Sequence, residues 1–165
     1  MPNWIYNSVT VSGDKNEIKK FFNECFTDDC IDFEKIIPSP KTKEECPPKY
    51  ICDPAEAHIE PRKGREWFNW YEWQCDFWGV KWNACDGETD LDNYFFFATP
   101  WEDPRPIFIK LMKLYPKLCF EVDVSGETDF PCFITYKNGE VTIEESDRDD
   151  DGDDWERYMN IGTRQ

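Results

Sequence analysis

Basic charge is scarce in this sequence, and long apolar runs are missing. No stretch approaches the roughly 20 mostly apolar residues that a membrane-spanning helix needs. The first 14 residues have no basic start, no apolar core and no small-residue cleavage site, so they do not resemble a signal peptide. We therefore expect a cytoplasmic protein.

The motifs of common enzyme classes are also missing. There is no CxxC pair, no HExxH zinc motif and no Gly-rich phosphate loop. The single histidine, His58, has no sequence signature of a partner for a serine or cysteine nucleophile. The sequence therefore predicts neither catalysis nor a cofactor.

Eight cysteines are present, but their pattern does not indicate a disulfide framework. Such frameworks belong to small secreted chains, so free thiols are expected here, although oxidation of a pair stays open. Cys46, Cys52 and His58 are zinc-ligand types, but they lack a fourth ligand and the usual finger spacing. No metal site is predicted from them.

The charge and aromatic content indicate a folded, acidic protein. The chain has 19 basic and 35 acidic residues, and its formal net charge is −16. Such a charge repels nucleic acid and attracts a basic partner. Phe, Trp and Tyr make up 17% of the residues, and aromatic side chains are what disordered chains lack. A dense core is therefore expected despite the high charge.

Periodicity predicts strands and helices in an alternating order. Asn138-Gly139 is a strong signal for a β-hairpin turn. Six prolines make 38–64 an irregular excursion, and 86–92 is a polar turn region. The expected strands are 3–12, 33–37, 80–84, 93–101, 118–124, 130–136 and 140–145, and the expected helices are 14–27, 65–78 and 104–115.

This order predicts an α+β fold of the ferredoxin-like sandwich type. The sheet would be mainly antiparallel, with helices on one face and a C-terminal β-hairpin. A single domain is expected over 1–145, with a Trp-rich insertion at 38–92, followed by an acidic tail at 146–165.

Four segments resemble one known family. They are MPNWIYNSVTVSG at the N-terminus, FEKIIPSP at 33–40, WYEWQCDFWGVKWNA at 70–84, and TPWEDPRPIF through LYPKLCFEVDV. Together they resemble the YubB-like family of small phage- and plasmid-encoded proteins, which is uncharacterised and assigned a ferredoxin-like fold. The resemblance implies this fold and a mobile-element origin, and it does not extend to the acidic end.

The acidic end is the first candidate site. Residues 140–156 hold ten carboxylates and one arginine, together with an aromatic residue that could anchor a partner. The alternative is a solubilising tail. The expected partner-binding residues are Glu144, Glu145, Asp147, Asp149, Asp150, Asp151, Asp153, Asp154, Trp155 and Glu156.

The same segment also contains half of a calcium loop. Asp147, Asp149, Asp151 and Gly152 match the first positions of an EF-hand loop, but Tyr158 stands where that loop needs a bidentate glutamate. Weak calcium binding therefore stays open.

The tryptophans give a second candidate site. Six of the eight lie between 67 and 101, where they could stack on a ligand or on bases, although core packing is the simpler interpretation. The candidate ligand-binding residues are Asn3, Asn7, Trp78, Lys81, Trp82 and Asn83.

These features lead to three functional hypotheses. The first is a non-catalytic mobile-element protein that binds and inhibits a basic, nucleic-acid-handling host protein in the host cytoplasm. Its target class would be defence factors, so the protein would act as an anti-restriction or anti-CRISPR inhibitor by nucleic-acid mimicry. The second is a ligand- or nucleic-acid-binding module that uses the Trp-rich insertion. The third is an uncharacterised enzyme.

Overall fold

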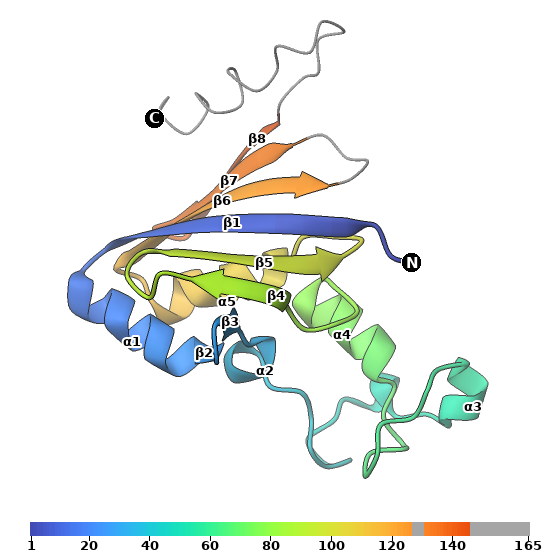
Figure 1. The fold of residues 1–165 in the computed structure, drawn as a ribbon. Coiled ribbons are helices and arrows are strands. Elements are labelled where there is room, and N and C mark those ends of the chain that lie inside the picture. Colours follow the sequence, from blue (N-terminus) through green and yellow to red (C-terminus); the bar gives the residue numbers. More distant parts are fainter. Residues whose placement is uncertain (127–130, 146–165) are drawn as a thin grey trace, which may run out of the picture.

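Residues 1–126 and 131–145 are described in this computed structural model. Their main element is one sheet of six strands in the order β4-β5-β1-β6-β7-β8, and every neighbouring pair is antiparallel (Figure 1). The strands are β1 (Trp4–Gly13), β4 (Cys85–Thr89), β5 (Tyr94–Pro100), β6 (Leu118–Gly126), β7 (Cys132–Lys137) and β8 (Glu140–Glu145). The α+β class and the antiparallel sheet are thus confirmed.

The helices lie on one side of this sheet (Figure 1). They are α1 (Lys15–Cys25), α2 (Phe33–Ile36), α3 (Pro54–Ala57), α4 (Trp70–Trp78) and α5 (Arg105–Leu114). The described residues also contain a two-stranded hairpin, β2 (Phe26–Thr27) with β3 (Cys30–Ile31), and a 3-10 turn at Pro48–Tyr50. Within the two described ranges, no helix has the length and apolar content to cross a membrane.

Local sequence explains where the two long helices begin. The Asp14 carboxylate accepts hydrogen bonds from the backbone N–H groups of Asn16 and Glu17, which caps α1. Pro106 lies in the first turn of α5, where its missing N–H costs nothing. The apolar faces of these helices then pack under the sheet through Phe21 and Phe108, which are fully buried.

Alternation along β1 separates the two faces of the sheet. Ile5, Val9 and Val11 point to the helices and are buried, whereas Tyr6 and Ser8 lie on the opposite face and are only partly buried. No helix of the described residues covers this opposite face, which we call the open face. Aromatic rings fill the layer between sheet and helices, including Phe95, Phe97, Phe120 and Tyr136.

Two predicted strands are wrong. Residues 33–37 form the short helix α2 instead, because the Asp32 side chain accepts the N–H of Glu34 and caps it. Residues 80–84 are irregular, and the strand is β4, inside the region predicted to be a polar turn. This strand lies at the sheet edge and carries alternating polar side chains, so it has little apolar signal.

Candidate functional site

The predicted acidic site begins on the edge strand β8. Cross-strand pairing places Glu144 opposite Phe133 and Glu145 opposite Cys132. Because successive side chains of a strand alternate, Glu144 lies on the open face and Glu145 on the helix side. The other predicted partner-binding residues, Asp147 through Glu156, and the half calcium loop lie outside the described residues.

Cross-strand neighbours form a row over the open face, and two of its members are carboxylates; we call it the acidic row. Pairing runs from Ser8 to Asp123, from Asp123 to Phe133, and from Phe133 to Glu144. The two carboxylates therefore flank one aromatic ring on neighbouring strands. The Oε2 atom of Glu144 is shielded from solvent and has no hydrogen-bond partner in the described part of the chain. Such an oxygen is a carboxylate acceptor that the described residues leave unpaired.

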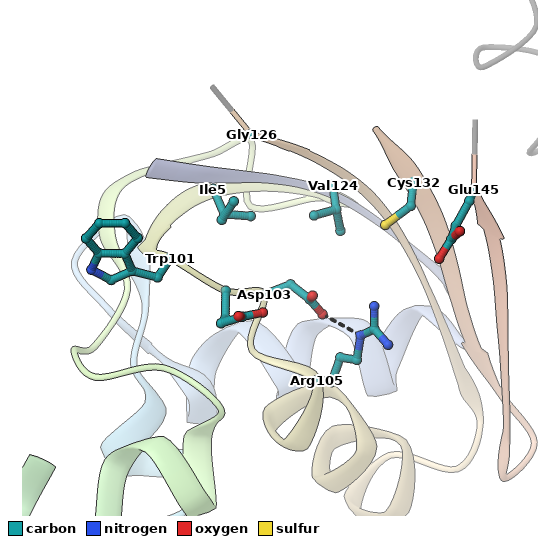
Figure 2. Close-up of a pocket in the computed structure, with 9 residues that line it drawn as sticks. Ile5, Trp101, Asp103, Arg105, Val124, Gly126, Cys132 and Glu145 are labelled. Atoms are coloured by element: carbon teal, nitrogen blue, oxygen red, sulfur yellow. Dashed lines mark hydrogen bonds and ion pairs between the residues drawn. The ribbon is translucent and has the colours of Figure 1, made fainter. Parts of the chain in front are cut away.

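A pocket of about 360 Å³ lies on the helix side of the same strands (Figure 2). Its wall at the sheet includes Ile5, Val124, Cys132 and Glu145, and its lower wall is the loop and first turn of α5. The full lining is Ile5, Trp101, Glu102, Asp103, Arg105, Val124, Gly126, Cys132 and Glu145.

The charged groups of the pocket are only partly paired. Arg105 Nε donates to Asp103 Oδ2 at 2.9 Å. Although partial burial opposes its charge, the Asp103 carboxylate raises the pKa of Arg105 above the ordinary arginine value. Burial, reinforced by Asp103, raises the pKa of the Cys132 thiol to about 11, so this thiol is protonated at neutral pH.

Two buried polar residues are linked by hydrogen bonds to the lining of the pocket. Asn7 and Thr99 are fully buried, and Asn7 Nδ2 donates to Thr99 Oγ1 at 3.2 Å. Thr99 Oγ1 in turn donates to the backbone carbonyl of Glu102, a lining residue, at 2.7 Å. Asn7 Oδ1 has no partner among the residues described. A buried amide oxygen left unpaired costs stability, and such costs are concentrated at functional sites.

Trp101 forms the outer end of the pocket. It is 48% exposed, and its φ of +69° is a left-handed backbone conformation that a bulky side chain rarely adopts. Its N–H donates to the carbonyl of Asn3 at 2.8 Å, which ties it to the start of β1. Trp4, the residue after Asn3, lies close to Trp82, and the distance between the two ring centroids is 6.5 Å.

The predicted ligand-binding residues do not all meet. Asn7 and Trp78 are buried on the helix side, where Trp78 Nε1 donates to the carbonyl of Ile37. The side chain of Asn83 stabilises the start of α2. Its Oδ1 accepts the N–H of Phe33, and its Nδ2 donates to the carboxylate of Asp32. At the surface, Lys81 lies 4.1 Å over the ring of Trp82.

Within the described ranges, no three His, Cys, Asp or Glu side chains are grouped so that they could hold a metal ion. This includes Cys46, Cys52 and His58, which are thus not gathered into one site.

Sequence reasoning missed the pocket because its residues are distant in the chain. Trp101 to Arg105 follow one strand, whereas Cys132 and Glu145 belong to a hairpin. The one local signal is the run Trp-Glu-Asp-Pro-Arg, which places opposite charges and an aromatic side chain in a single turn before a helix.

Comparison with protein-family models, with curated proteins and with solved structures gives no match to this chain.

Proposed function

We propose that this is a non-catalytic protein that binds a basic, nucleic-acid-handling protein through the open face of β6–β8. The observation that carries the proposal is the Glu144 carboxylate, which has one oxygen shielded from water and unpaired among the described residues. Because a carboxylate in that state is unfavourable on its own, a lysine or arginine of a partner would relieve its cost.

The distribution of charge along the sequence supports the same end of the chain. From Leu118 onward the sequence has fourteen carboxylates and four basic side chains. The helix layer, by contrast, contains exposed lysines on α1 and α5. A basic partner is therefore attracted to the C-terminal strands and repelled by the helices.

The mechanism is competition for phosphate-binding side chains. Asp123 and Glu144 lie on the same face two strands apart, so their backbones are separated by about 10 Å. Phe133 lies between them as an apolar contact. Carboxylates placed in this way would occupy lysines and arginines that otherwise meet nucleic-acid phosphates. The acidic segment that follows β8 adds to this charge in sequence.

The fold is proposed to be ferredoxin-like. The order of β1, α1, β4, β5, α5 and β6 along the chain and the sheet order β4-β5-β1-β6 support this assignment. In this interpretation β7 and β8 extend the sheet by one hairpin. Membership of the YubB-like family, a mobile-element origin and a defence factor as the partner are narrower proposals, and the sequence resemblance alone supports them.

The test is affinity capture from lysate of the native host cell, at about 50 mM and about 500 mM salt. The wild type is compared with a triple variant of the open face, E121Q/D123N/E144Q, and with E145Q on the other face. Glu121 lies two residues before Asp123 on β6 and so on the same face. The proposal predicts a basic nucleic-acid-binding protein that the triple variant and high salt both release. Duplex nucleic acid should displace the purified partner. Equal capture by wild type and triple variant would contradict the proposal.

A further inference from the structure

The pocket on the helix side holds two opposite charges that do not meet. Figure 2 shows the guanidinium of Arg105 and the carboxylate of Glu145 facing each other across the cavity. No ion pair joins them, and the only salt bridge found for Arg105 in the described residues is through Nε to Asp103. Within residues 1–126 and 131–145, the terminal nitrogens of Arg105 are therefore left as donors and the Glu145 oxygens as acceptors.

A ligand that pairs with both Arg105 and Glu145 needs a negative and a positive group. A carboxylate fits the planar fork of a guanidinium, which can donate two parallel hydrogen bonds to it. An ammonium group fits Glu145. A simple cation would leave the Arg105 fork unpaired, and a simple anion would be repelled by Glu102 and Glu145.

The remaining walls are suited to a side chain. Ile5 and Val124 give an apolar base, and the half-exposed Trp101 lies at the outer end with its indole directed away from the cavity. The volume of about 360 Å³ lies at the small end of the range for ligand sites. With Arg105 neutralised by Asp103, Glu102 and Glu145 leave an excess of negative charge. An additional positive group on the ligand would offset that excess.

We infer that this pocket binds a small zwitterion of the α-amino-acid class and favours one with a basic side chain. Its carboxylate binds Arg105, its ammonium binds Glu145, and its side chain lies toward Glu102 and Trp101. The site is on the opposite side of the sheet from the proposed partner-binding face, so the two proposals are independent.

The test is titration of the ¹⁵N-labelled full chain by NMR with L-arginine up to about 10 mM. Two analogues each remove one charge: agmatine lacks the carboxylate, and Nα-acetyl-L-arginine lacks the ammonium. Both should bind at least about tenfold more weakly than L-arginine, since each leaves one wall unpaired. Shifts should concentrate on residues Trp101 to Arg105.

Two variants assign the charges to their walls. In R105Q, L-arginine and agmatine should bind equally, because the carboxylate has lost its partner. In E145Q, L-arginine and Nα-acetyl-L-arginine should bind equally. E144Q is the matched control, since it makes the same change one residue away on the other face, and it should bind like the wild type.

Three results would overturn the inference. One is no shift in the wild type with L-arginine at about 10 mM. Another is binding of agmatine as tightly as L-arginine, which would mean a plain cation site. The third is an equal loss in E144Q and E145Q. Dispersed amide spectra of each variant show that a lost response is not a lost fold.

Discussion

Glu144 and Glu145 are adjacent on β8, but their side chains lie on opposite faces of the sheet. Glu144 belongs to the acidic row with Asp123, and Glu145 lines the pocket opposite Arg105. The strand period of two residues thus splits one acidic segment into two sites. Substitution of either residue removes one negative charge from the same strand. A comparison of the two variants therefore distinguishes the effect of the face from the effect of the lost charge.

Replacing Glu144 by Gln should increase stability at low salt. The change removes a partly shielded charge in the same row as Asp123, which we expect to be worth up to about 1 kcal/mol. Urea unfolding at low and high salt measures it. The gain should shrink at high salt, and E145Q should show a smaller change. A loss of stability in E144Q would mean that its carboxylate is already satisfied.

Replacing Asn7 by Leu should maintain or raise stability by about 1 kcal/mol. The substitution removes a fully buried amide whose Oδ1 has no partner in the described ranges, and it keeps a similar volume. Thr99→Val is the comparison, because it deprives both Asn7 Nδ2 and the Glu102 carbonyl of a partner and should destabilise. Thermal unfolding gives both values. A clear loss in N7L would show that its bond to Thr99 outweighs the unpaired oxygen.

Gly87→Ala should destabilise the protein by about 1–3 kcal/mol. A Cβ at Gly87 would lie 2.5 Å from Cys30 Cβ and 2.6 Å from Cys30 Cα, so the backbone of β3 would have to move away from β4. The matched control is Glu88→Ala, an exposed neighbour on the same edge strand, which should stay within about 0.5 kcal/mol of the wild type. Equal unfolding midpoints for the two variants would contradict this close contact.

Stability should fall as the pH rises above 9. Burial raises the pKa of Cys25 from 9.0 to about 11, although the hydrogen bond between its thiol and the Tyr115 hydroxyl opposes this. The unfolded chain therefore releases this proton first, so the stability from the buried neutral thiol is complete below pH 9 and is lost toward pH 11. Urea unfolding between pH 7 and pH 11 should show a shallower decline for Cys25→Ala than for wild type. Identical slopes would refute the assignment to this thiol.

The parts of the fold that were predictable have strong local signals. The hairpin of β7 and β8 follows from Asn138-Gly139, and α5 follows from its prolines and the period of its apolar residues. The strand β4 was not predictable, because an edge strand pairs on one side and can be polar along its length. The helix α2 is four residues long, so its capping aspartate is a weaker signal than its apolar run.

The site was predictable only in part for a related reason. The charge of β8 is visible in the sequence, but the face that each glutamate occupies depends on the register with Phe133 and Cys132. The pocket also needs α5 to place Arg105 beneath that hairpin. Asn7 occupies an inward position of an alternating strand, and only the packed structure shows that its oxygen is unpaired.

Capture of a basic partner by the open face is the measurement that tests the proposed function. Wild type, E144Q and E145Q are compared in low-salt capture from native host lysate, and the retained protein is then purified and titrated against each form. We expect a basic, nucleic-acid-binding partner whose affinity falls with E144Q and with rising salt, and is unchanged by E145Q. A partner that binds E144Q as tightly as the wild type, or no basic partner at all, would contradict it.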